Sequence, residues 1–187
     1  MIGFEKMSKR FQSLEISKSQ KHFLIATLLS IAMWPFFYYW TSLDNFLSEN
    51  LLHTSRRIIG LTTGKTPEPL IYPNLGKFIM RDERASLLIG HVCNGKSLYY
   101  LLIAFIFAIP GRKLITKIVY SLAGIIILYT LNSLRISALF QIAKKLPDWF
   151  HVFHHDIFQF SMYAVLFAIW IFYLKNTGNS PSTSQSQ

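Results

Sequence analysis

Apolar residues along the chain gather into four runs of nearly membrane length, separated by polar or charged segments. These runs are His22 to Trp40, Cys93 to Pro110, Leu114 to Leu134 and Asp156 to Leu174. Each is close to the roughly 20 residues that a helix needs to cross the hydrocarbon core of a bilayer. The pattern predicts an all-α membrane protein with about four transmembrane helices.

The first two runs each carry a distinguishing signal. Pro35 lies inside the first run and predicts a kink, which neighbouring helices tolerate in a membrane. Polar residues precede this run and no small-residue cleavage pattern follows it, so we expect it to stay as a transmembrane helix. In the second run the purely apolar part, Leu98 to Ile109, is short. A buried re-entrant segment is therefore an alternative to a full span there.

The long segment 41–92 predicts an interfacial helix followed by a small β-hairpin. Apolar residues recur at helical spacing in its first half, which is typical of a helix lying on a membrane surface. They are Leu43, Phe46, Leu47, Leu51, Ile58 and Ile59, with Arg56 and Arg57 as polar partners. After the turn-rich Gly64 to Pro73, apolar residues at Phe78 to Met80 and Ala85 to Val92 flank a polar turn. These two runs predict the strands of the hairpin.

Charge predicts the orientation of the chain in the membrane. Five basic residues precede the first run, whereas Thr41 to Ser55 has no lysine or arginine and carries Asp44 and Glu49. By the positive-inside rule, the amino terminus is cytoplasmic and the segment 41–92 is extracytoplasmic. Although the net charge is +10, the cations flank apolar runs and form no patch with interleaved aromatic residues. The basic excess thus predicts topology in a cell (inner) membrane, and no nucleic-acid partner.

This orientation divides the chain into five parts. They are a basic cytoplasmic amino terminus (1–21), a first transmembrane helix (22–40), an extracytoplasmic loop (41–92), a three-helix core (93–175) and a cytoplasmic tail (176–187). The tail is rich in serine, glutamine and threonine and is predicted to be disordered.

Three ionisable residues are predicted to lie at one depth. Counted from the nearest cytoplasmic charge, Cys93, Arg135 and His155 lie about 19, 22 and 20 residues away, or roughly 28, 33 and 30 Å along a helix. All three fall near the outer boundary of the hydrocarbon. An ionisable group in or beside a membrane is costly to hold, and it marks a functional hypothesis whose partner should be named.

The chemistry of these three residues fits a cysteine nucleophile. Cys93 is the only cysteine, so it forms no intramolecular disulfide, and a nearby cation or imidazole stabilises its thiolate. His155 is expected to take the thiol proton and return it to a leaving amine. Arg135 is expected to stabilise the oxyanion of a tetrahedral intermediate. Together they predict an acyl-transfer site that faces outward.

Each of these residues also has an explanation without catalysis. Cys93 is then a packing residue, Arg135 extends to lipid phosphates, and the histidines anchor an aromatic membrane interface. One alternative function is a non-catalytic subunit of an export or surface-assembly complex. A less favoured alternative is a metal or haem protein that uses the thiol and the outer histidines. Its ligands would be His91, Cys93, His151, His154 and His155.

The region from Phe78 to Trp170 resembles the exosortase/archaeosortase family of membrane cysteine enzymes. The resemblance rests on a hairpin leading into Cys93-Asn94-Gly95, on Asn132-Ser133-Leu134-Arg135 near the end of a helix, and on His155-Asp156 opening the last span. Two positions depart from the family pattern. Asn94 stands where the family usually has serine, and the region Phe158-Gln159 replaces a glycine that often follows the histidine.

The resemblance implies a role for each matching residue. The nucleophile is Cys93, the arginine is Arg135 and the histidine is His155, with the adjacent His154 as an alternative base; Gly95 and Asn132 support the site. It also implies a transpeptidase-like enzyme without a cofactor or metal. Its partners are membrane lipid and exported proteins that end in a short motif, a hydrophobic helix and a basic tail. The acceptor of the acyl group stays open between water, lipid and glycan.

Overall fold

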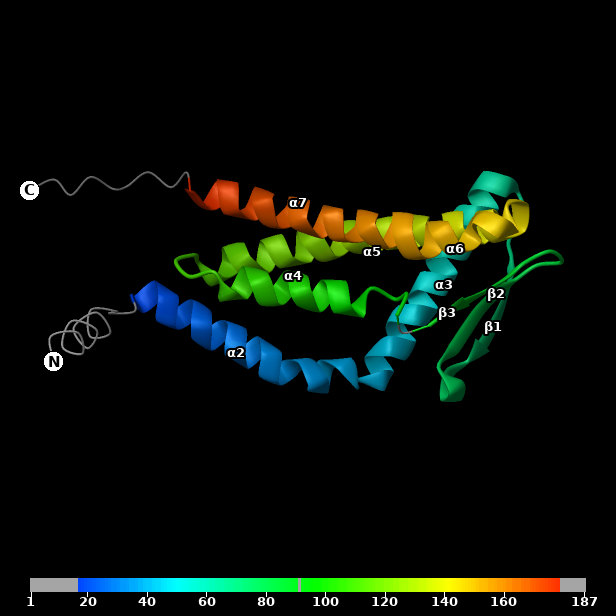
Figure 1. Cartoon of the computed structure of the whole chain (residues 1–187). Coiled ribbons are helices and arrows are strands. Elements are labelled where there is room, and N and C mark those ends of the chain that lie inside the picture. Colours follow the sequence, from blue (N-terminus) through cyan, green and yellow to red (C-terminus); the bar gives the residue numbers. More distant parts are fainter. Residues whose placement is uncertain (1–16, 91, 179–187) are drawn as a thin grey trace, which may run out of the picture.

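The computed structural model describes residues 17–90 and 92–178, which form a long helical bundle with a small sheet at one end (Figure 1). The main helices are α2 (Lys18–Tyr38), α3 (Thr41–Thr63), α4 (Lys96–Ala108), α5 (Leu114–Lys145) and α7 (Phe158–Gly178). The strands are β1 (Glu68–Tyr72), β2 (Lys77–Arg81) and β3 (Ser86–Ile89). Short helical turns are η1 (Pro73–Leu75), η2 (Pro147–Trp149), α6 (Phe150–Val152) and η3 (Phe153–Ile157).

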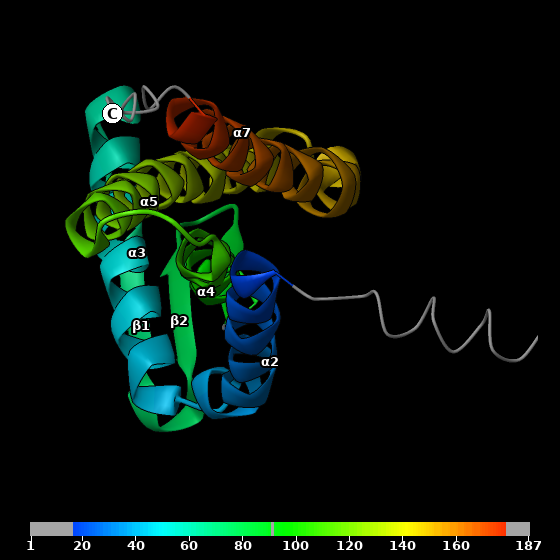
Figure 2. The ribbon, with the colours of Figure 1, turned by 90° about the vertical axis from the view of Figure 1, so that its left-hand side faces the viewer.

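Helices α2, α4, α5 and α7 run side by side along the bundle, and α4 contacts the other three. Figure 2, seen from the end where α2 begins, shows α4 beside α2 and below α5. The side chains of Leu102 and Ile106 on α4 are fully buried against Leu128 of α5 and Leu166 of α7. This apolar contact holds α4, α5 and α7 together.

Three helical segments are long and apolar enough to cross a membrane. They are α2, α5 and the stretch Pro147–Asn176. Helix α4, the expected second span from Cys93 to Pro110, has only 13 residues, or about 20 Å. The prediction of a full span there is therefore wrong in length, because Cys93, Asn94 and Gly95 form a turn before the helix and not its first turn.

Helix α5 is longer than its predicted span of Leu114 to Leu134, since it continues to Lys145. The apolar run ends where Asn132, Arg135 and Ser137 appear, but these polar residues do not end the helix. Asn132 and Ser137 are buried against other parts of the protein. Helix α5 thus extends from the bundle to the sheet and carries side chains at both.

Helix α3 lies steeply across the end of the bundle, as Figure 1 shows, and packs on α5 and β2. Helical spacing predicted this helix correctly. The apolar face that we expected to rest on a membrane surface is partly covered by protein instead, because Leu51 and Ile59 are buried in the core while Phe46 is exposed. These buried residues pack with Phe78 of β2 and Phe140 of α5.

The expected two-stranded hairpin is a three-stranded antiparallel sheet in the order β1-β2-β3. Strand β1 was missed, because Pro69 and Pro73 made its sequence resemble a turn. A proline is tolerated on an edge strand, and β1 is an edge of this sheet. Pro69 pairs with Met80, and Phe78 pairs with Ile89. The sheet delivers the chain from β3 to the Cys93 turn.

The last helical segment begins before the predicted Asp156. It includes η3, a π-helical turn over Phe153–Ile157, and continues through α7 to Gly178. The first three residues of the expected tail, 176–178, are thus helical. Residues 1–16 of the predicted basic amino terminus and 179–187 of the predicted tail lie outside the described residues.

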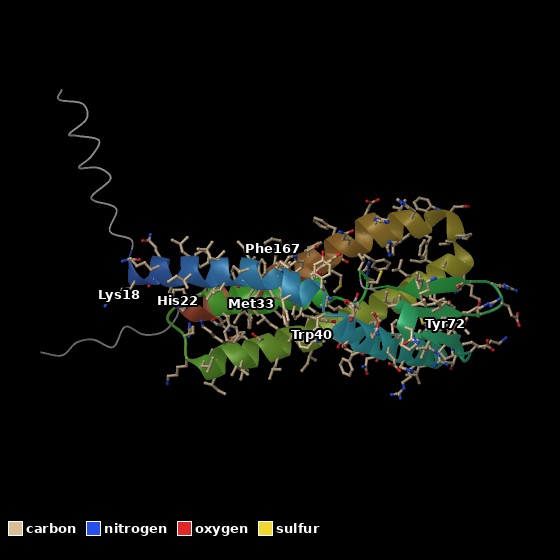
Figure 3. All side chains as sticks on the ribbon, turned by 90° about the horizontal axis from the view of Figure 1, so that it is seen from below. Lys18, His22, Met33, Trp40, Tyr72 and Phe167 are labelled. Carbon is tan, nitrogen blue, oxygen red and sulfur yellow. The ribbon has the colours of Figure 1, made fainter. Side chains whose placement is uncertain are left out.

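Helix α2 lies at the outer side of the bundle, against α4. None of its side chains, all of which are described, is buried, and its main contacts are with α4. The helix continues through Pro35 to Tyr38. Figure 3 shows Lys18 and His22 near one end of α2 and Trp40 just past the other, with Tyr72 beyond, beside the strands.

Candidate functional site

Cys93 lies in the tight turn that joins β3 to α4. Its backbone N–H donates to the Gly90 carbonyl over 2.9 Å, and its side chain is a free thiol of which 9% is exposed. A free cysteine at this degree of burial is a small hydrophobe unless a polar partner reaches its sulfur. The structure provides that partner.

His154 is the imidazole that reaches the thiol. Its Nε2 lies 3.6 Å from the Cys93 Sγ, although the two residues are 61 positions apart in the sequence. The π-helical turn η3 places His154 there, and such turns recur at functional sites. The ring of His154 stacks on Phe150, one turn earlier, with centroids 5.6 Å apart. This stacking holds the imidazole against the sulfur.

His155, the base expected from the sequence, does not hold the corresponding position. It is exposed and stacks on His151 at 4.6 Å between ring centroids. Its ring lies edge-on to His154 at 4.9 Å and lines the same cavity. Consecutive residues on a helix point about 100° apart, so the choice of His154 over His155 depends on the local helical geometry.

Asn132 and Arg135 reach the site from α5. Residues three apart lie on one face of a helix, which is why the Asn-x-x-Arg spacing matters. Asn132 is fully buried; its Nδ2 donates to the backbone carbonyl of Cys93 over 2.8 Å. The Arg135 Nη1 donates to Asn132 Oδ1 over 3.4 Å. Asn132 thus links the cysteine turn to the guanidinium.

Arg135 keeps donor capacity for a further group. Within the described part of the chain, its buried Nε–H has no hydrogen-bond partner. A buried donor without a partner costs free energy, so an acceptor that entered the cavity would be stabilised there. Hydrogen-bond donors of this kind can stabilise an oxyanion.

Gly95 precedes the first residue of α4 with a φ of 81°, a conformation that favours glycine. A Cβ at this position would lie 3.0 Å from the Tyr99 Oη and 3.3 Å from the Asn132 Nδ2. Gly95 is therefore required by both the turn and the closely packed side chains behind it.

A cavity of about 320 Å³ lies between the end of α2, the start of α4, the Arg135 region of α5 and the start of α7. Its wall includes Cys93, Gly95, Arg135, His154, His155, Lys96 and Tyr163. A second cavity, of about 690 Å³, lies between the end of α3, the β2–β3 turn and the end of α5. Among the described residues that line this larger cavity there is no cysteine or histidine, so the candidate chemistry belongs to the smaller one.

The sequence reasoning missed Lys96, which also borders the smaller cavity. Its side chain is buried and its Nζ lies 2.5 Å from Asp44 Oδ2. A lysine inside a predicted apolar span was a usable signal, because such a charge needs a partner. The partner was not evident from the sequence, since Asp44 lies 52 residues earlier.

Among residues 17–90 and 92–178, no group of three or more histidine, cysteine or acidic side chains is arranged to hold a metal ion. His91, one of the metal ligands considered from the sequence, lies outside the described residues. Comparisons with protein-family models, with curated proteins and with solved structures find no match to this chain.

Proposed function

We propose that the protein is an integral-membrane cysteine peptidase or transpeptidase of the exosortase/archaeosortase kind. It cleaves carboxy-terminal sorting signals of exported proteins at the outer face of the cell membrane. The contact of 3.6 Å between Cys93 Sγ and His154 Nε2, in a cavity that also contains Arg135, carries this proposal. A nucleophile and a base within reach of each other are the signature of covalent catalysis.

In the proposed reaction His154 takes the proton of the Cys93 thiol while the sulfur attacks the carbonyl carbon of the scissile peptide. The carbonyl oxygen becomes an oxyanion, which receives hydrogen bonds from Arg135. When the carbon–nitrogen bond breaks, His154 returns its proton to the leaving amine and a thioester to Cys93 remains. A water molecule or an acceptor nucleophile then attacks the thioester and releases the sulfur.

The long helices support a substrate that is itself membrane-anchored. A hydrophobic substrate helix packed against the bundle would place its preceding motif at the outer end of the bundle, where the cavity lies. The orientation expected from the amino-terminal charges puts this end outside the cytoplasm.

The decisive experiment pairs the protein with a co-expressed secreted protein that ends in a short motif, an apolar span and a basic tail. We expect Cys93→Ala and Cys93→Ser to abolish its processing at normal expression level. Hydroxylamine should cleave the acyl thioester and free the acyl group as a hydroxamate from the wild-type enzyme only. Asp148→Asn, at an exposed position away from the cavity, is the matched control. Intact processing in both Cys93 variants would exclude the nucleophile role.

A further inference from the structure

A buried polar cluster lies directly beneath the cysteine turn. Asp44, near the start of α3, receives the Asn94 Nδ2–H at Oδ1 over 2.9 Å and the Lys96 ammonium at Oδ2 over 2.5 Å. The Lys96 Nζ also donates to the Tyr38 carbonyl at the end of α2 over 2.6 Å. Ser48 lies 3.4 Å from the same Asn94 amide nitrogen. The cluster thus joins three elements to the residue that follows Cys93.

This cluster is costly to bury. Only 1% of Asn94 and 4% of Lys96 is exposed, and the Asp44 side chain is 16% exposed. A buried ion pair loses about as much free energy by leaving water as it gains by pairing, and apolar replacements are often as stable. Stability alone therefore does not account for a lysine and an aspartate at this place. A need to hold the neighbouring turn in one position does account for both residues.

Asn94 connects the cluster to the nucleophile through both ends of its side-chain amide. Its Nδ2 donates to Asp44, and its Oδ1 accepts from the Lys96 backbone N–H over 3.0 Å, which gives the first N–H of α4 a partner. A serine hydroxyl is shorter and offers a single oxygen for both tasks. The amide at position 94 thus suits this chain, where serine is usual in the family that it resembles.

We propose that Asp44 and Asn94 are positioning residues for Cys93: the Asp44–Asn94 hydrogen bond fixes the cysteine turn so that the thiol meets His154 and the carbonyl carbon of the substrate. The reaction in question is the one proposed above, on which this inference rests. Lys96 neutralises Asp44 and fixes it to the end of α2. Neither Asp44 nor Asn94 contacts the reacting atoms; both act through the backbone of the turn.

An exchange of the two side chains tests this proposal. Asn94→Asp alone places two carboxylates against each other. Asp44→Asn alone removes the charge that balances Lys96 and leaves one acceptor oxygen where Asn94 and Lys96 use two. In the double variant D44N/N94D, an amide and a carboxylate face each other again with the hydrogen bond reversed, and one negative charge still balances Lys96. All three variants keep the side-chain sizes, and Asp148→Asn is the control for an isolated carboxylate-to-amide change.

Two measurements are made on full-length protein in detergent or membranes. The first is kcat and KM on a peptide with the tripartite carboxyl terminus; the second, which needs no substrate, is the rate of Cys93 alkylation by N-ethylmaleimide. We expect each single variant to lower kcat about ten- to a hundred-fold with little change in KM, because small misplacements of a reacting group cost this much. The double variant should recover most of kcat and the wild-type alkylation rate, since coupled residues are not additive.

The kcat values and alkylation rates of the variants test the positioning role and the proposed function separately. Single variants with wild-type kcat and alkylation rate would overturn the positioning role, as would a double variant that is as impaired as the singles while eluting as a folded monodisperse protein. If the wild type processes no substrate but alkylation falls in the single variants and recovers in the double variant, the positioning of the thiol stands and the proposed function fails.

Discussion

Replacing His154 by glutamine distinguishes the two adjacent imidazoles as partners of the thiol. Glutamine is close to histidine in size and keeps a polar nitrogen, but it does not take up and release a proton near neutral pH. The same change at His155 is the matched control, because both histidines line the cavity and only His154 contacts the Cys93 sulfur.

The structure sets the expected magnitudes. A general base in hydrogen-bond reach contributes about 10²- to 10⁴-fold to rate, so His154→Gln should lower kcat/KM by that factor, about 3 to 5 kcal/mol of transition-state stabilisation. His155 is exposed, and its ring lies edge-on to that of His154, 4.9 Å away between centroids. We expect His155→Gln to cost less than about ten-fold, or 1.4 kcal/mol.

The assay compares initial rates of substrate cleavage by the two variants at equal amounts of folded protein. The Cys93→Ala variant serves as the inactive reference. Alkylation of Cys93 measured in parallel shows whether the thiolate itself is less available in His154→Gln. A His155 variant that is inactive beside a His154 variant of nearly normal rate would refute the assignment of the base. Equal small losses in both would refute general-base catalysis by this cluster.

Three further outcomes follow from other parts of the molecule. Gly95→Ala should lower both activity and thermal stability, by about 1 to 3 kcal/mol for the strained φ, because its Cβ would also crowd Tyr99; normal unfolding would contradict this. The hydrogen bond from Lys144 is the main reason why the pKa of Asp82 lies below its ordinary value. The stabilisation from that carboxylate is therefore complete above its ordinary pKa and is lost as pH falls through the lower folded value. We expect Asp82→Asn to flatten the pH dependence of unfolding below about pH 4, as followed by thermal scans at several pH values. A membrane-impermeant maleimide should label Cys93 in whole cells, and labelling only after lysis would reverse the proposed orientation.

Hydrophobic spacing predicted the helices of the bundle but not all their limits. The end of α5 was placed too early because Asn132 and Arg135 interrupt the apolar run. In a protein interior, however, polar side chains that find partners do not end a helix. The Asn132 amide donates to the Cys93 carbonyl, and the Ser137 hydroxyl donates to the Ser55 carbonyl. Such partners come from distant segments, which hydropathy does not reveal.

The candidate site shows the same division between local and long-range information. Counting residues along the helices predicted that Cys93 and Arg135 lie at the same depth, and both border the cavity. The sequence could not show which of His154 and His155 contacts Cys93, because this depends on the π-helical turn. Such a turn adds one residue to a helical turn and rotates the side chains that follow relative to those that precede it. The Asp44–Lys96 ion pair could not be predicted from the sequence, because the two residues meet only through the packing of α3 against the turn before α4.

The order in which the chain is made bears on when the thiol acquires its partner. The segment with Cys93 emerges well before the last helix, and the imidazole that contacts it comes from the turn that begins this helix. A nascent chain that ends before residue 154 therefore lacks the contact between this thiol and an imidazole. The thiol and the imidazole therefore meet only after α5 has been made and the chain has turned back into the last helix, and the chemistry proposed for Cys93 waits for that contact.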